Sequence, residues 1–168
     1  MHMPHIRSVG LAISLALIAS TSALAHGDSA HDTVPGAKKN APAEQTGFGI
    51  AGESSKISRT IDMDALDTFR FTPDKLAVKR GETIRFVMRN KGKIQHEIVI
   101  GTMAELKEHA ALMQKFPEME HEGANMAHVA PGKSGEIVWT FNRPGTFNFA
   151  CLIAGHFESG MVGTIVVT

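Results

Sequence analysis

Three side chains that can bind a metal lie at regular intervals in one stretch near the C-terminus. The stretch CLIAGHFESGM runs from Cys151 to Met161 around His156, which gives the pattern C-x4-H-x4-M. Cys151 is the only cysteine of the 168 residues, so the chain cannot form an internal disulfide. Taken singly, these residues would be interpreted as a core cysteine, a surface histidine and a core methionine. Their spacing in one loop that also contains Gly155 and Gly160 favours a metal site instead.

The combination of donor atoms favours copper. Copper electron-transfer sites combine one thiolate and two imidazoles with a weak axial thioether. The loop supplies three of these donors, and we expect the second imidazole from His96, at the start of the run HEIVI. Zinc also binds cysteine and histidine, but a thioether is a poor zinc ligand. Met161 therefore favours copper, and the mixed donor set suits both Cu(I) and Cu(II).

Short runs of alternating apolar and polar residues predict that β-strands position these ligands. Turn sequences such as NKGK, APGKSG and RPG separate the runs. The expected strands lie within 59–65, 69–78, 82–90, 96–101, 136–141, 146–151 and 161–168. Several short strands with such turns are typical of a β-sandwich, where the end of the strand that begins at His96 can lie beside the loop between the last two strands.

One segment, 102–116, has helical periodicity instead. Its apolar residues recur at helical spacing, at Met103, Leu106, Ala110 and Met113. Thr102 is expected to cap this helix, and Glu105 completes a capping box. Residues 117–132 are expected to follow as an irregular loop. The predicted fold is therefore all-β, a sandwich with one helix-plus-loop insertion.

The N-terminus predicts export. Residues 1–25 combine a short basic start, an apolar run and a small-residue cleavage site, which is the pattern of a secretory signal peptide. The apolar run is shorter than the roughly 20 residues that span a bilayer. We therefore expect a periplasmic protein that keeps no stable membrane span after cleavage.

The next segment, 26–58, is rich in alanine, glycine, serine and proline, and we expect it to be flexible. A mature N-terminus at His26, with His31 nearby, could chelate copper, although a disordered tail is the simpler explanation of both residues. The folded domain is predicted to span 59–168.

Charge and histidine spacing exclude several classes of function. The 17 basic residues are balanced by 17 acidic ones, which does not suit a nucleic-acid-binding protein. Multicopper oxidases need H-x-H pairs for an oxygen-reducing cluster, and the nine histidines include none. A binuclear purple copper centre needs two cysteines. We therefore expect no enzymatic activity.

The stretches 71–101 and 131–167 resemble the cupredoxins, the small blue-copper family. The resemblance covers most of the chain from residue 69 to residue 167. It implies a Greek-key β-sandwich with one type 1 copper near one end, bound by His96, Cys151, His156 and Met161. It also implies that His156 is the point of electron entry and exit, ringed by apolar residues such as Ala154 and Phe157.

More narrowly, the chain resembles the exported cupredoxins of bacterial copper tolerance. The shared features are the run HEIVIG, the inserted helix with EHA, an M-x-H loop and the terminal GHFESGMVGTIVV.

Two positions depart from the common cupredoxin pattern. Glu97 stands where many members have an asparagine that hydrogen-bonds to the cysteine loop, and Leu152 stands where many have serine or threonine. We expect Glu97 to point outward, which would leave its substitution without consequence.

Two functions are compatible with this site. The first is a one-electron Cu(I)/Cu(II) carrier in periplasmic copper tolerance, with a periplasmic redox protein as partner and a monomeric state. The alternative is a copper-sequestering or copper-delivery protein that uses the type 1 site together with a Met/His-rich loop and has no dedicated redox partner. In that case a second, weaker copper site would lie in the insertion, at Met119, His121, Met126 and His128. These four residues could equally belong to a solvated polar loop.

Overall fold

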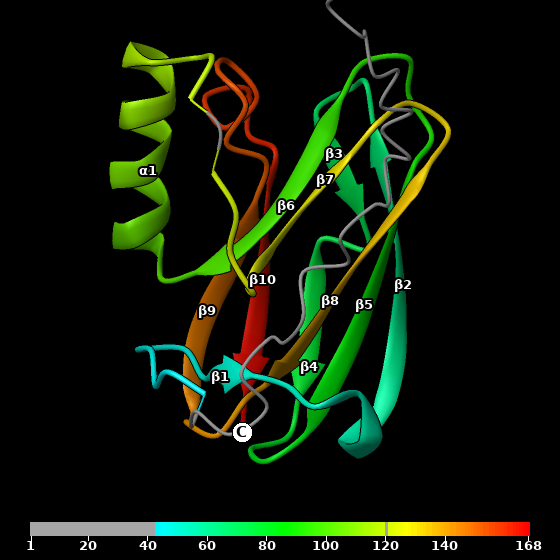
Figure 1. Ribbon diagram of the computed structural model, residues 1–168, viewed down its shortest axis with the longest axis vertical. Coiled ribbons are helices and arrows are strands. Elements are labelled where there is room, and N and C mark those ends of the chain that lie inside the picture. The colour runs from blue at the N-terminus through cyan, green and yellow to red at the C-terminus, as the bar shows by residue number, and fades with distance from the viewer. Residues whose placement is uncertain (1–42, 120) are drawn as a thin grey trace, which may run out of the picture. The chain divides into compact units, whose positions relative to one another are not determined.

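The computed structural model describes residues 43–119 and 121–168 (Figure 1). The expected signal peptide, the start of the expected flexible segment and the two histidines at 26 and 31 lie outside the described residues.

Two five-stranded sheets form the framework, with strand orders β1-β8-β5-β2-β3 and β4-β10-β9-β6-β7. The strands of the first sheet are β1 (Ile50–Ala51), β8 (Ser134–Thr140), β5 (Thr83–Asn90), β2 (Arg59–Leu66) and β3 (Arg70–Thr72). Those of the second are β4 (Lys75–Val78), β10 (Val162–Val167), β9 (Gly145–Ala150), β6 (His96–Gly101) and β7 (Met126–Val129). A short 3-10 turn, η1 (Ser54–Lys56), follows β1. The predicted all-β sandwich is confirmed.

Alternating side chains from both sheets fill the core between them. In β5, for example, Ile84, Phe86 and Met88 are fully buried, while the residues between them are partly exposed. Aromatic pairs join segments that are distant in the sequence, such as Phe71 and Phe149 with ring centroids 5.2 Å apart. Edge-to-face pairs of this kind add stability beyond the area they bury.

The predicted helix is present as α1 (Met103–Lys115). The side chain of Thr102 accepts a hydrogen bond from the N–H of Glu105, and the Glu105 carboxylate accepts one from the N–H of Thr102. This confirms the capping box. Across the described ranges, neither this helix nor any other has the length and apolarity to cross a bilayer.

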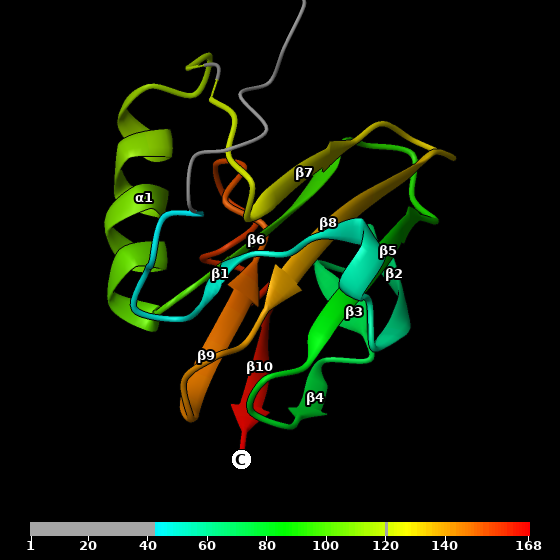
Figure 2. The ribbon, with the colours of Figure 1, turned by 60° about the horizontal axis from the view of Figure 1, so that its bottom comes forward.

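Helix α1 covers the outer face of β6 and β9 (Figure 1, Figure 2). Its residues Leu106 and Met113 pack with Val99 and Leu152 in a small apolar cluster separate from the main core. Consequently β6 is buried on both faces, and all six of its residues are inaccessible to solvent. As a result, residues on both faces of β6, which begins at the predicted ligand His96, are removed from water.

The structure differs from the sequence-based expectation in two segments. Residues 126–129, expected in an irregular loop, form β7, which pairs with β6 and places His128 opposite Glu97. Residues 43–58, expected to be flexible, include β1 and a buried Phe48 whose ring stacks on Trp139 at 5.0 Å. The stacking of Phe48 on Trp139 and the pairing of β1 with β8 thus hold this polar segment on the sandwich.

Candidate metal centre

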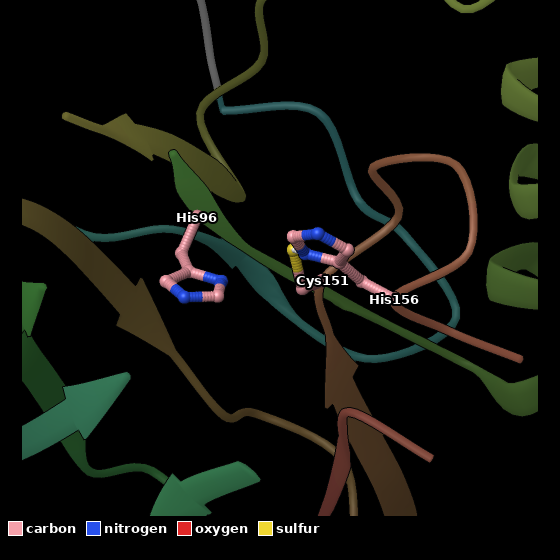
Figure 3. A group of neighbouring side chains, drawn as sticks. All are labelled: His96, Cys151 and His156. Carbon is pink, nitrogen blue, oxygen red and sulfur yellow. Dashed lines mark hydrogen bonds between the residues drawn. The ribbon is translucent and has the colours of Figure 1, made fainter. Parts of the chain in front are cut away.

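Three of the four predicted ligands meet at one end of the sandwich. One ligand atom from each of His96, Cys151 and His156 lies within 4.8 Å of the others, and all three residues are buried. His96 opens β6, Cys151 directly follows β9, and His156 lies on the loop between β9 and β10. Figure 3 shows the three side chains directed toward a common space. Donor atoms about 2.0–2.3 Å from one metal lie roughly 3–4 Å apart, and the 3.2 Å between Sγ of Cys151 and Nδ1 of His156 falls in that range.

The imidazole of His96 is oriented by Asp67, which sequence reasoning missed. Its Nε2 lies 3.1 Å from Oδ1 of Asp67. Since a carboxylate accepts, Nε2 donates, and the buried Nδ1 is left with a free lone pair and no hydrogen-bond partner. The N–H of Lys93 and the contact with His96 hold the pKa of Asp67 below its ordinary value. An ionised Asp67 therefore fixes the tautomer in which Nδ1 can bind a metal.

Replacing Asp67 with asparagine should weaken copper binding and raise the reduction potential. The neutral amide no longer increases the basicity of His96, so Cu(II) loses more stabilisation than Cu(I). Altering such an outer partner typically costs about 10–100-fold in metal affinity. Potentiometry of the Asp67→Asn protein measures the shift, with the exposed Asp74→Asn as the charge-matched control. Equal potentials for the two variants would show that Asp67 does not tune the site.

The sulfur of Cys151 is enclosed by protein. The residue is fully buried, its Sγ lies 3.2 Å from Nδ1 of His156, and the N–H of Glu97 donates to Sγ at 3.4 Å. Burial raises the pKa of the Cys151 thiol to about 12, although the Glu97 N–H opposes this shift. Only a bound cation would make the thiolate the stable form near neutral pH.

Copper binding should therefore release a proton from Cys151. Because the thiol pKa is about 12 in the metal-free protein, the apparent Cu(II) affinity should rise about tenfold per pH unit between about pH 7 and about pH 8. At pH values low enough to protonate His156, whose pKa burial lowers, the dependence should steepen. Competition with a chelator, corrected for the chelator's own protonation, measures this slope. An affinity independent of pH would contradict thiolate ligation.

The loop from Cys151 to Met161 has the curled form expected from its glycines. Gly155 and Gly160 adopt φ of 87° and 88°, a region that other residues rarely enter. The N–H of Met161 donates to the carbonyl of His156, and the N–H of Cys151 donates to the carbonyl of Met161. These bonds tie the three predicted loop ligands together at the backbone.

The ring of His156 is packed against Phe69, a second residue that sequence reasoning missed. Their ring centroids lie 4.6 Å apart, and Phe69 adopts a positive φ of 58° in the turn before β3. Burial, and then the proximity of His96, lower the pKa of His156. The imidazole is therefore neutral near pH 7 and can bind a metal. Phe157 is only partly buried and Ala154 is exposed beside it.

Met161 is fully buried and belongs to the main core cluster. Its position directly before β10 brings its backbone next to Cys151 and His156. Its role as the axial ligand remains a prediction.

The expectation for Glu97 is wrong. Strand alternation does direct it to the outer face of β6, but α1 and the following loop cover that face, and Glu97 is 0% exposed. Its Oε1 accepts a 2.7 Å hydrogen bond from the N–H of Leu152. Burial raises the pKa of the Glu97 carboxyl, while the Leu152 N–H and two nearby histidines oppose the rise. Glu97 thus makes a hydrogen bond to the cysteine loop, as the asparagine at this position does in many cupredoxins according to the resemblance.

A second group of potential ligands lies on the other side of Glu97. One ligand atom from each of Glu97, His121 and His128 lies within 4.8 Å of the others. These residues line an open pocket of about 860 Å³, together with Met119. Met126 lines a neighbouring hollow and packs against the small apolar cluster. Of the four residues expected at a second copper site, the structure therefore brings two histidines and Met119 to one pocket, and adds a carboxylate.

Comparisons with known proteins agree with this geometry. The sequence model of copper binding proteins of the plastocyanin/azurin family matches residues 57–168. The copper-resistant cuproprotein CopI of Rubrivivax gelatinosus is 48% identical over 153 residues, which cover 90% of this chain and 91% of that protein. CopI of Pseudomonas aeruginosa is 33% identical over 155 residues, covering 75% and 85% of the two chains.

Among solved structures, dithionite-reduced auracyanin from Roseiflexus castenholzii is similar with a TM-score of 0.57. The match covers 67% of this chain and 98% of auracyanin at 24% identity, and it supports the fold alone.

Proposed function

Since this chain belongs to the plastocyanin/azurin family of copper-binding proteins, we propose that it is an exported type 1 copper protein that carries single electrons in periplasmic copper tolerance. The observation that carries this proposal is the convergence of His96, Cys151 and His156 at one buried point. The CopI proteins to which the chain is similar are described as copper-resistant cuproproteins. That description supports the role in copper tolerance.

The donor set suits reversible one-electron chemistry. We assign His96, Cys151, His156 and Met161 as the ligands of one copper ion. Copper held by them supplies the Cu(I)/Cu(II) couple, in which thiolate stabilises Cu(II) and thioether favours Cu(I). The protein's own contribution is rigidity, because β6, β9 and the backbone bonds within the loop fix the donors before any metal binds.

His156 is the proposed point of electron transfer to a periplasmic redox partner. It is 7% exposed, and the exposed Ala154 and partly buried Phe157 flank it. An apolar rim of this kind suits brief docking to another redox protein. The protein is proposed to act as a monomer and to have no enzymatic activity.

Copper sequestration is the second candidate function, and the cluster of Glu97, His121 and His128 favours it. Imidazole and carboxylate donors suit copper and zinc ions, and Met119 on the same pocket adds a soft donor for Cu(I). A second, weaker copper ion is proposed to bind there. Both functions can operate together, since a sequestered ion and a redox-active ion would occupy different sites.

Growth on excess copper separates the two functions. A strain that lacks this gene is complemented with the unmodified protein, with Cys151→Ser, or with the double variant His121→Ala, His128→Ala. If electron transfer at the type 1 site provides tolerance, Cys151→Ser fails to restore growth while the double variant restores most of it. Full growth with Cys151→Ser would instead make sequestration the main function.

A further inference from the structure

We propose that Glu97 couples the two metal sites, so that a metal ion bound by Glu97, His121 and His128 changes the reduction potential of the type 1 copper. This inference rests on the proposed function, because it requires copper at the type 1 site. It is carried by one buried residue whose atoms contact both sites.

On one side, Glu97 contacts the cysteine loop through two hydrogen bonds. Its N–H donates to Sγ of Cys151 at 3.4 Å, and its Oε1 accepts from the N–H of Leu152 at 2.7 Å. Hydrogen bonds to a metal-bound sulfur and to the adjacent backbone control the electron density on that sulfur. Any displacement of the Glu97 carboxylate is therefore transmitted to the thiolate.

On the other side, the remaining Glu97 oxygen faces two imidazoles that have free lone pairs. Nδ1 of His121 lies 3.0 Å from the carbonyl of Met119, and Nε2 of His128 lies 3.1 Å from the carbonyl of His121. A carbonyl can only accept, so both of these nitrogens donate. In the neutral rings, Nε2 of His121 and Nδ1 of His128 then carry lone pairs.

Two buried acceptor atoms of this group are unsatisfied. Nε2 of His121 and Oε2 of Glu97 are buried without a hydrogen-bond partner. Oε2 lies 3.0 Å from Nδ1 of His128, without hydrogen-bond geometry. With a neutral His128 ring, Oε2 and Nδ1 are two acceptors in contact, an unfavourable arrangement that either a proton on Nδ1 or a metal cation relieves. A proton on His128 would still leave Nε2 of His121 unsatisfied. A metal ion bound by all three residues satisfies every one of these atoms.

A cation at Oε2 should raise the type 1 potential. It neutralises the Glu97 charge and draws electron density away from Oε1, which weakens the bond to Leu152. The added positive charge also disfavours Cu(II) relative to Cu(I). The bound metal thus favours the reduced type 1 copper by some factor. By thermodynamic linkage, reduction of the type 1 copper must tighten metal binding at the second site by that same factor. The second site would thus hold its ion more firmly when the type 1 copper is reduced.

Zinc is a suitable probe because it has no redox chemistry and no visible spectrum. The full-length protein is loaded with one equivalent of Cu(II), zinc is added, and retention of the type 1 copper is checked by metal analysis. The potential and the thiolate-to-copper band are then recorded with and without zinc. Zinc affinity is measured separately for the oxidised and reduced protein. Comparison proteins are Glu97→Gln, the His121→Ala, His128→Ala double variant, and Glu108→Gln as an exposed, charge-matched control on α1.

We expect zinc to bind at least about fivefold more tightly to the reduced protein, at the lower end of typical coupling. This corresponds to a rise of about 40 mV in the type 1 potential, at about 59 mV per tenfold for one electron. The rise should persist in Glu108→Gln, and it should be lost in the double variant and strongly reduced in Glu97→Gln.

Zinc bound at the two histidines with an unchanged type 1 potential would overturn the coupling and leave the type 1 assignment intact. Failure of the copper-loaded protein to bind zinc would also overturn it, by removing the second site. Absence of a thiolate-to-copper band before zinc is added would instead contradict the proposed function itself.

Discussion

Cys151→Ser should abolish the visible thiolate-to-copper charge-transfer band completely. The band requires a sulfur ligand, and Cys151 is the only thiol in the chain. Serine is close in size to cysteine, and its buried oxygen can accept the hydrogen bond that the N–H of Glu97 now donates to Sγ, so the fold should be retained. The Cu(II) affinity should fall by more than the roughly 10–100-fold caused by altering an outer partner of a ligand. Absorption and spin-resonance spectra of the copper-titrated variant measure both effects.

Met113→Leu is the matched control, because Met113 is a buried sulfur residue of α1 that belongs to the small apolar cluster and not to the predicted ligand set. It should keep the band at full intensity. A surviving band in Cys151→Ser would require a different donor set and would remove the type 1 assignment.

His96→Ala should produce the second large effect. It removes the one predicted ligand that lies outside the loop and opens the centre on the side of β6. The Cu(II) affinity should again fall more than about 100-fold, and the remaining spectrum should change shape because solvent can occupy the vacated position. The carboxylate of Asp67 would also lose its imidazole partner. Copper competition and spin-resonance spectra are the measurements.

His109→Ala controls for the loss of a histidine. His109 lies on α1 with its ring 4.5 Å from that of His121, outside the type 1 group. Its replacement should leave the type 1 spectrum unchanged. A spectrum for His96→Ala that equals that of the unmodified protein would show that another residue supplies the second imidazole.

Local patterns predicted the framework and the three candidate ligands that the structure brings together. Strand alternation, turn residues and the capping box at Thr102 are each encoded within a few neighbouring residues, so they could be identified without the fold. Cys151 and His156 lie in one short loop, and His96 could be identified because it begins the strand-like run HEIVI. The sandwich then brings the start of β6 to this loop.

The residues that surround the ligands could not be predicted in the same way. Asp67 and Phe69 reach the centre through the turn between β2 and β3, and no spacing rule relates them to His96 or His156. The burial of Glu97 depends on what covers the outer face of β6, which strand alternation alone does not reveal. The strand β7 forms by pairing with β6, although its sequence MAHV has few β-branched residues.

X-ray absorption at the copper edge of the protein loaded with one equivalent of Cu(II) tests the type 1 centre most directly. It should find one sulfur at a short thiolate distance together with two imidazole nitrogens, as the convergence of His96, Cys151 and His156 requires. A copper ion surrounded only by nitrogen and oxygen donors, without the short sulfur contact, would contradict the assignment.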